Sequence, residues 1–168
     1  GSATISGAIG TSGGLNVSDG TLALSSLNSY TGNTTVSGGA LNLTGAGTLG
    51  AIANALSVSA GTLDLGNTTQ TQNGGLTLTG GTIQNGTLSS SATFGVQAGT
   101  ISAALTGAGA VNKTSSGSAT ISGAIGTSGG LNVSAGTLAL SSLNSYTGNT
   151  TVSGGALNLT GAGTLGAI

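Results

Sequence analysis

The sequence predicts an all-β fold, a parallel β-helix (β-solenoid) in which short strands stack as rungs of about 19–20 residues. Three observations predict it: a short pattern recurs along the chain, apolar and polar residues alternate within each recurrence, and glycine-containing pairs separate the recurrences. With one Phe, two Tyr and no Trp among 168 residues, the core has to be narrow and filled by aliphatic side chains. A narrow core suits a solenoid, because each rung packs mainly on its neighbours.

A flexible chain and a helical chain are the alternatives, and the sequence disfavours both. High Gly and Ser content can mark disorder, but the mean hydropathy of +0.37 shows that the chain has apolar surface to bury. The 35 glycines and the lack of a sustained i, i+3, i+4, i+7 stripe oppose helices. The absence of Pro leaves every backbone N–H available for strand pairing.

The short pattern is V-S-x-G-[TA]-L-x-L. It begins at Val17, Val36, Val58, Val133 and Val152, with looser versions at Leu78 and Val96 and a related segment from Thr120. In the first of these, Val17, Leu22 and Leu24 can all point inward if Asp19 and Gly20 form a turn that resets the alternation. Each recurrence is therefore interpreted as one rung.

A longer repeat contains the short one. Gly1–Ile52 recurs as Gly117–Ile168, offset by 116 residues, and differs only where Asp19 is replaced by Ala135. We expect a single continuous solenoid over residues 1–168, with a long repeat at 1–116 and a partial second copy at 117–168. At a strand spacing of about 4.8 Å, the chain would form 8–9 rungs, and one long repeat would advance roughly 29 Å.

The segment from Asn28, NSYTGNTTVSGGALNL, recurs from Asn144 and resembles the autotransporter-associated β-strand repeat of bacterial type V passenger regions. The degenerate rungs extend the likeness over nearly the whole chain. The resemblance implies a right-handed parallel β-helix displayed outside a Gram-negative cell, often as the stalk of an adhesin. A signal sequence, a membrane barrel and an inserted functional subdomain are not found in these residues.

Catalysis is not expected, because few side chains can take part in proton transfer. Asp19, Asp64, Lys113, Tyr30 and Tyr146 are the titratable side chains, and neither His nor Cys is present. Asp19 and Asp64 occupy different positions in their rungs, which opposes a carboxylate pair that cleaves polysaccharides and favours turn-forming or solubilising roles. Calcium binding needs several carboxylates, so no metal site is expected.

A glycine motif at Gly45–Gly50, copied at Gly161–Gly166, matches G-x-G-x-x-G, and Asp64 follows at a spacing close to that of a ribose-binding carboxylate. A dinucleotide site requires a helix after the motif, but the next segment leads into another rung. The motif is therefore interpreted as a turn, and no catalytic, cofactor-binding or metal-binding residues and no cofactors are predicted.

The remaining polar and aromatic residues also favour structural roles. Tyr30, Tyr146 and Phe94 are expected to pack in the core, with an exposed ligand-binding ring as the alternative for the tyrosines, and Lys113 is expected to be solvated. Stacked Asn or Thr ladders are favoured over glycosylation at the N-x-[ST] triplets. These triplets begin at Asn16, Asn33, Asn42, Asn67, Asn85 and Asn112, among others.

The favoured function is a rigid stalk segment of a bacterial surface protein, with neighbouring repeats of the same chain as its partners. The alternatives are an extracellular filament that assembles end to end and, less favoured, a flat ice- or glycan-binding face. The last is disfavoured because Leu76–Thr79 and Thr82 supply threonines without a T-x-T row at fixed register. A net charge of −1 opposes nucleic-acid binding, and no apolar run of about 18 residues predicts membrane insertion.

Overall fold

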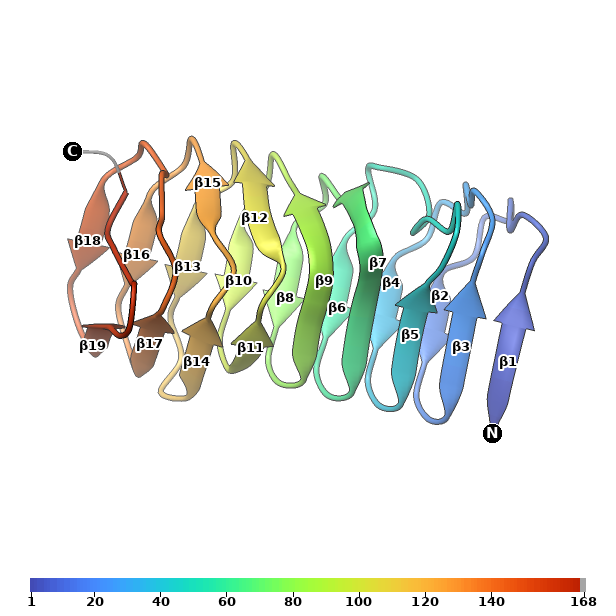
Figure 1. Ribbon diagram of the computed structural model, residues 1–168, viewed down its shortest axis with the longest axis horizontal. Coiled ribbons are helices and arrows are strands. Elements are labelled where there is room, and N and C mark those ends of the chain that lie inside the picture. The colour runs from blue at the N-terminus through green and yellow to red at the C-terminus, as the bar shows by residue number, and fades with distance from the viewer. Residues whose placement is uncertain (167–168) are drawn as a thin grey trace.

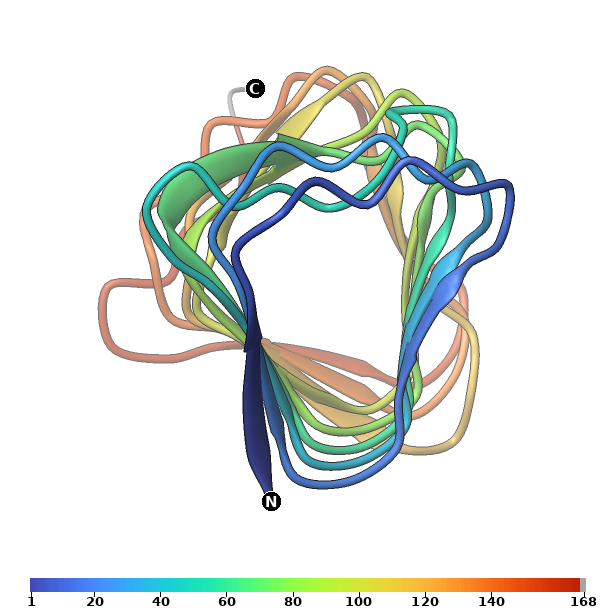
Figure 2. The same cartoon turned by 90° about the vertical axis from the view of Figure 1, so that its right-hand side faces the viewer.

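The computed structural model describes residues 1–166, which coil into an elongated rod of stacked, three-sided turns (Figure 1). Seen from its N-terminal end, the chain runs clockwise as it recedes from the viewer, so the coil is right-handed (Figure 2). No segment of the described chain is a helix long and apolar enough to cross a membrane. The β-solenoid predicted from the sequence is thus confirmed.

Face A is the longer of the two continuous parallel walls of the rod. Its strands are β1 (Ser2–Ile5), β3 (Thr21–Leu24), β5 (Ala40–Leu43), β7 (Thr62–Thr71), β9 (Thr82–Ser89), β11 (Gly99–Ile101), β14 (Ser118–Ile121), β17 (Thr137–Leu140) and β19 (Ala156–Leu159), in that spatial order. Each strand pairs in parallel with its neighbour one turn later along the chain.

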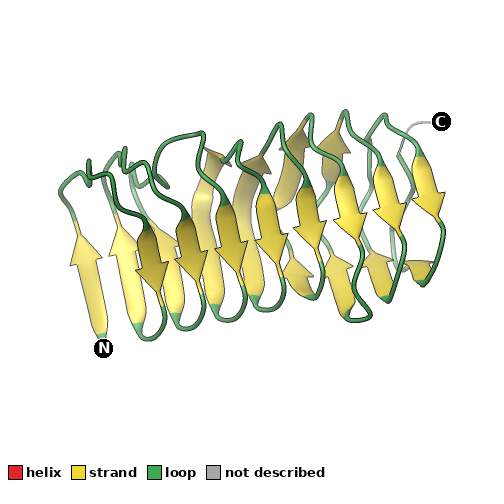
Figure 3. Cartoon of the chain, turned by 180° about the vertical axis from the view of Figure 1, so that it is seen from behind, coloured by secondary structure: helices red, strands yellow, loops and turns green. Residues whose placement is uncertain are grey.

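Face B is the second wall, and its eight strands mark the turns of the described chain (Figure 3). They are β2 (Leu15–Val17), β4 (Thr34–Val36), β6 (Leu56–Val58), β8 (Leu76–Leu78), β10 (Phe94–Val96), β13 (Val111–Lys113), β16 (Leu131–Val133) and β18 (Thr150–Val152). Face B follows the predicted rungs closely, because its strands contain the valines that begin most of the short repeats.

Face C, the third side, is regular only in the middle of the rod. There the second halves of β7 and β9 pair with each other and continue into β12 (Ala104–Gly107) and β15 (Ile125–Thr127). In the first, second, third and eighth turns the chain crosses this side as loops, at residues 6–14, 25–33, 44–55 and 141–149.

The core lies between the three faces and forms one continuous column of aliphatic side chains. Val17 and Leu24 are buried and Leu22 packs against the same cluster, while Gly20 adopts a φ of 66° at the corner between them. The turn proposed from the sequence therefore resets the alternation as expected. A Cβ at Gly20 would lie 2.4 Å from the carbonyl oxygen of Gly1, so this corner requires glycine.

The corners that lead from face B to face A are uniform except at two neighbouring turns of the described chain. Three residues separate the strands at the other corners, whereas two separate β10 from β11 and four separate β13 from β14. Across this pair of corners, Thr82 of β9 pairs with Thr100 of β11, and Thr100 pairs with Thr120 of β14. The row of paired residues that begins at Ser2 therefore reaches Thr120, although the residue that corresponds to Ser2 in the second long repeat is Ser118. Face A is therefore offset by two residues after one long repeat.

Because the long repeat occurs twice, the same leucine can be compared inside the rod and at its end. Leu43 is 2% exposed, whereas its copy Leu159, in the last strand, is 48% exposed. Leu43→Ala should lower the free energy of unfolding by about 2–5 kcal/mol, because it leaves a cavity between covered rungs. Leu159→Ala should cost clearly less.

Urea denaturation followed by circular dichroism measures both variants against the parent chain. The residues around Leu43 and Leu159 are identical in sequence, so the difference between the two variants measures how much the next rung contributes to stability. Equal losses of stability for Leu43→Ala and Leu159→Ala would contradict the stacking shown here.

Candidate functional site

The first polar element of the interior is Asn28, which lies in a face C loop and joins three successive turns. Its Oδ1 accepts a hydrogen bond from the backbone N–H of Ile9 at 2.9 Å in the turn before. Its Nδ2 donates to the carbonyl oxygens of Ser26 at 2.9 Å and of Thr48, in the turn after, at 2.7 Å. The Asn28 amide thus supplements the backbone hydrogen bonds between turns, such as that from the Ser29 N–H to the Ile9 carbonyl oxygen, where the chain is not a strand.

The second copy of the repeat builds the same arrangement around Asn144. Oδ1 of Asn144 accepts from the backbone N–H of Ile125 at 2.8 Å, and its Nδ2 donates to the carbonyl oxygens of Ser142 and Thr164 at 3.0 and 2.7 Å. The first residue of the N-x-Y motif is therefore a structural bridge between rungs, a role that the sequence analysis did not assign.

Tyr30, the third residue of the motif, fills the wide part of the core under the same loop. It is 1% exposed, and its hydroxyl shares a hydrogen bond with Oγ1 of Thr34 at 2.6 Å, as Tyr146 does with Thr150 at 2.7 Å. Burial raises the pKa of Tyr30 above its ordinary value, although the hydrogen bonds with Thr34 and Gly50 partly oppose this shift. Both tyrosines, and Phe94, are buried as predicted, so their rings are not exposed to ligands.

Lys113 is buried, and the expectation that it is solvated is wrong. It is the last residue of β13 and pairs with Val133, so its side chain occupies an inward position that holds valine in most other turns. The side chain is 0% exposed, and its Nζ donates to the backbone oxygen of Ser115 and, at 3.1 Å, to Oγ of the same residue. These acceptors lie in the four-residue corner between β13 and β14.

The longer corner explains how a lysine can replace valine in this column. The corner lies next to the end of the Lys113 side chain and supplies oxygen acceptors for its ammonium group, which compensates part of the cost of removing the charge from water. Neither aspartate lies on a strand that pairs with the strand of Lys113, because Asp19 and Asp64 lie outside β10 and β16, the strands that pair with β13. The ammonium charge is therefore not neutralised by a carboxylate on a neighbouring strand. Burial therefore lowers the pKa of Lys113 below its ordinary value.

A sequence signal for this burial existed. The segment V-N-K from Val111 aligns with L-N-V from Leu131, and Lys113 falls on the inward valine. An isolated lysine is ordinarily solvated, but the strand register places this one inward.

The two acidic residues are not brought together. Asp19 lies in the corner before β3, exposed, and accepts a hydrogen bond from the Gly20 N–H at 2.7 Å, whereas Asp64 lies in β7, with β5 between β3 and β7. Burial tends to raise the pKa of Asp64, but hydrogen bonds from Gln84, Gly66 and Asn85 outweigh it and hold the pKa below its ordinary value. Asp64 thus links β7 to β9 on the outer surface.

The glycine motif at 45–50 lies in the face C loop after β5, and no helix follows it. Gly45 has a φ of 56°, and the N–H of Gly47 donates to the Thr44 carbonyl at 2.8 Å, which closes a turn. A Cβ at Gly50 would come within 2.5 Å of the ring of Tyr30. The motif therefore shapes the loop and gives Tyr30 room, as its interpretation as a turn suggested.

One of the expected side-chain ladders is present on the outside of face B. Nδ2 of Asn132 donates to Oδ1 of Asn112 at 2.9 Å across neighbouring rungs. On face A, a single row of outward threonines crosses four successive strands, at Thr62, Thr82, Thr100 and Thr120. The sequence analysis noted the absence of a T-x-T row but missed this single one.

Parts of the chain match a known family of repeats. The passenger-associated-transport-repeat family matches residues 19–43, 111–140 and 135–159, which include both N-x-Y segments. These three segments of the chain are similar to passenger-associated transport repeats. No curated protein and no solved structure matches the chain significantly.

These passenger-associated repeats confirm the family resemblance seen in the sequence and indicate a segment of a secreted passenger, located outside the cell or on its surface. The structure explains the matched residues in physical terms. Segment 135–159 is the second copy of segment 19–43, and each runs through a corner, a face A strand, the N-x-Y loop, a face B strand and the next face A strand. One match therefore spans slightly more than one turn of the solenoid.

The interior groups described above support a structural role for the passenger repeats. Asn28 and Lys113 direct their polar atoms to the backbone of the rod, and the Tyr30 hydroxyl is bonded to a neighbouring side chain. Among the described residues, no group of three or more Asp, Glu, His or Cys side chains is placed to bind a metal ion.

We expect Asn28→Ala to destabilise the rod by about 1–3 kcal/mol, because it removes the partner of the half-buried Ile9 N–H and of the Thr48 carbonyl oxygen, while the Ser26 carbonyl oxygen keeps the Thr48 N–H. Asn28→Asp should also destabilise, since a carboxylate accepts from Ile9 but cannot donate to Ser26 or Thr48. Asn16→Ala, on the exposed side of face B, is the matched control. Urea denaturation measures all three, and an unchanged midpoint for Asn28→Ala would contradict the bridging role.

Lys113→Met removes the buried charge and keeps most of the side-chain volume. We expect the variant to be at least as stable as the parent at pH 7, because the cost of desolvating the ammonium disappears. The corner at 114–117 should exchange its amide hydrogens faster, since its internal donor is lost. Hydrogen-exchange mass spectrometry tests the corner, and denaturation tests the whole rod.

The pH dependence of the parent has a definite sign. The pKa of Lys113 is lower in the folded than in the unfolded chain, so the unfolded chain binds more protons between the two values. The stability of the parent relative to Lys113→Met should therefore rise as the pH increases through that window, just below the ordinary lysine pKa. A relative stability that does not change with pH would show that the lysine is solvated, and one that falls with pH would show that folding favours its charged form.

Proposed function

We propose that this chain is a rigid stalk segment of a passenger displayed on the surface of a Gram-negative cell, where it holds a functional tip away from the membrane. The observation that supports this best is the continuity of faces A and B, which run through the described chain as unbroken parallel ladders. A rod with hydrogen bonds along its axis resists bending and compression, as a spacer must.

The modular organisation supports the same proposal. One long repeat contains six turns, so each added copy would lengthen the rod by roughly 29 Å. A protein built this way changes its reach by gaining or losing whole copies. The near identity of the two copies fits selection for uniform length better than selection for a particular local site.

We propose that the segment is not itself an enzyme. The titratable side chains are few, Asp19 and Asp64 are apart, and Lys113 and Tyr30 are buried in the rod. Recognition of a host or of another cell would then fall to other parts of the passenger.

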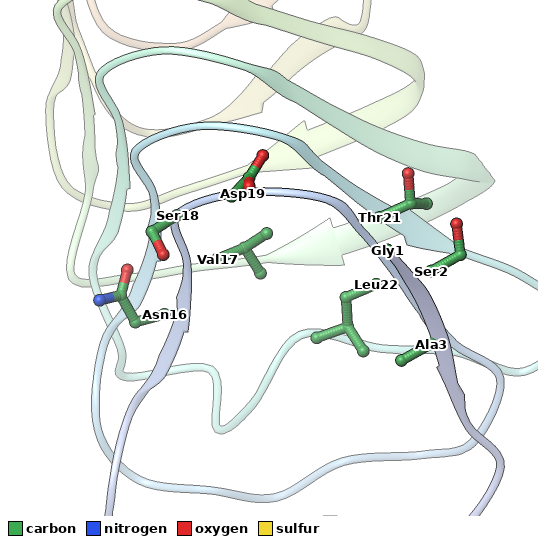
Figure 4. Close-up of a pocket in the computed structure, with 9 residues that line it drawn as sticks. All are labelled: Gly1, Ser2, Ala3, Asn16, Val17, Ser18, Asp19, Thr21 and Leu22. Atoms are coloured by element: carbon green, nitrogen blue, oxygen red, sulfur yellow. The ribbon is translucent and has the colours of Figure 1, made fainter.

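An extracellular filament that grows end to end is the second candidate, because an uncovered strand of a parallel ladder can pair with a strand of another rod. Ile5 is 36% exposed and Val152 is 50% exposed, whereas their copies Ile121 and Val36 are each 0% exposed. Figure 4 shows Ala3, Val17 and Leu22 pointing into the hollow that the first turn leaves open. A second rod could cover this hollow with its last turn.

The stalk proposal predicts that length follows covalent copy number. Chains of one, two and four long repeats, imaged by negative-stain electron microscopy, should give separate rods that lengthen by roughly 29 Å per copy. Fibres whose length is independent of copy number would favour the filament instead.

A charge variant provides the control. Ile5→Lys with Leu159→Lys places a charge on each open end, which should abolish end-to-end contacts and leave the length of single rods unchanged. Shorter or collapsed particles for the multi-copy chains would contradict both proposals, because they would mean that the turns do not stack across copies.

A further inference from the structure

Away from the ends of the described rod, the large exposed apolar side chains are those of Leu27 and Ile52, both on face C loops; Leu143, the copy of Leu27, is exposed in the eighth turn. Leu27 is 68% exposed, its copy Leu143 is 69% exposed, and Ile52 is 63% exposed. Leu27 lies in the second turn, with complete turns on both sides, so its exposure does not arise from the end of the chain. The Leu27 ridge is defined here as Leu27 and Ile52, with Leu143 as its second copy.

The local structure forces the ridge outward. Asn28 and Tyr30 are both anchored inward, and alternation along the loop then leaves Leu27 and Ser29 facing solvent. Ile52 lies in the next turn, just before Asn54, whose Nδ2 donates to the Tyr30 carbonyl at 2.8 Å. The ridge is therefore held on a fixed scaffold and keeps its apolar side chains in water.

A groove runs between Leu27 and Ile52, but it does not suit a small polar ligand. Thr69–Thr71 line it together with the two ridge residues. Gln70, its largest polar side chain, already accepts from the Leu49 N–H at 2.9 Å and donates to Thr68 at 2.7 Å. No charged side chain lines this groove in the described chain.

The size of the ridge favours a partner that repeats with the same period. Stable protein interfaces bury on the order of 1,200–2,000 Å² in total, more than one ridge of two apolar side chains can supply. A partner that contacted several ridges at once would gain from each of them, because the later contacts form within one complex. A second copy of this rod has the same 116-residue spacing between ridges.

Charge favours the same partner. The chain has three charged side chains, and none of them lies in the loops at 25–33, 44–55 or 141–149 that carry the ridge. Two copies can therefore approach side by side without the repulsion that like-charged surfaces would produce. Serines, threonines and glycines dominate these loops, and their small side chains allow close contact between rods.

We propose that the Leu27 ridge is a lateral docking surface for a second copy of this rod, and that pairing strengthens with the number of long repeats. This goes beyond the stalk function, which requires no contact between rods. The contact is weak for each ridge, so short segments remain mostly separate while long arrays associate along their sides.

The test uses the Ile5→Lys, Leu159→Lys chain, in which contacts through the ends are blocked. Analytical ultracentrifugation at high protein concentration should show weak, reversible dimers of this short chain, and Leu27→Ser with Leu143→Ser should weaken dimerisation by roughly tenfold or more for each leucine that was buried. Thr35→Ala with Thr151→Ala, on the outer side of face B, is the matched control and should leave the dimer unchanged. Circular dichroism checks that every variant is folded.

Cysteine cross-linking then locates the contact, because the natural chain has no Cys. Ser29→Cys, Ser145→Cys and the double variant should form intermolecular disulfides in at least one case, whereas Thr35→Cys should not. Dimers that persist after both leucine changes, or cross-links through Thr35→Cys instead, would overturn the proposal. So would a chain of four long repeats that stays monomeric under the same conditions. None of these results depends on whether the rod acts as a stalk.

Discussion

The structure depends on the register of its parallel ladder. An inward leucine or valine is buried only when the turns before and after it place their own inward residues directly above and below. Val152 is exposed whereas its copy Val36 is buried, which shows how much of the burial of an inward residue comes from the turn that covers it. Because a slip of one residue would turn apolar side chains outward, each corner has to return the chain to the same phase. The positive-φ glycines at the corners, such as Gly20, meet that requirement.

Where the ladder is interrupted, side-chain amides take its place. The face C loops do not form strands, yet Asn28 supplies donors and an acceptor at the spacing of the missing backbone groups. Tyr30 then fills the volume that the wider loop opens. The N-x-Y motif is thus a compact solution to two problems at one position, backbone satisfaction and packing. The two matched family segments that contain this motif, 19–43 and 135–159, thus have a physical meaning that does not require a ligand.

Alternation, turn chemistry and period were enough to predict the solenoid, the rung length and the inward residues of the first turn. They were not enough for face C, because the residues that satisfy the backbone there are loop residues without strand periodicity. Lys113 was misjudged for a different reason. Its burial depends on a corner one residue longer than most, and the effect of that corner is visible only once the strands are aligned across turns. The exposure of Leu27 was likewise hidden, since a leucine beside a core tyrosine is ordinarily assigned to the core.

The irregular corner at Lys113 has a consequence for how such an array folds. Nearly identical turns invite errors, because a strand can pair with the wrong copy of its partner and still bury the right kind of side chain. Among the described turns, the four-residue corner bonds to Gln97 in the corner of the turn before, through the Thr114 N–H and the Ser115 hydroxyl. A chain displaced by whole turns would lose these bonds. The irregular corner therefore distinguishes the correct alignment of the ladder from alignments that are displaced by one turn.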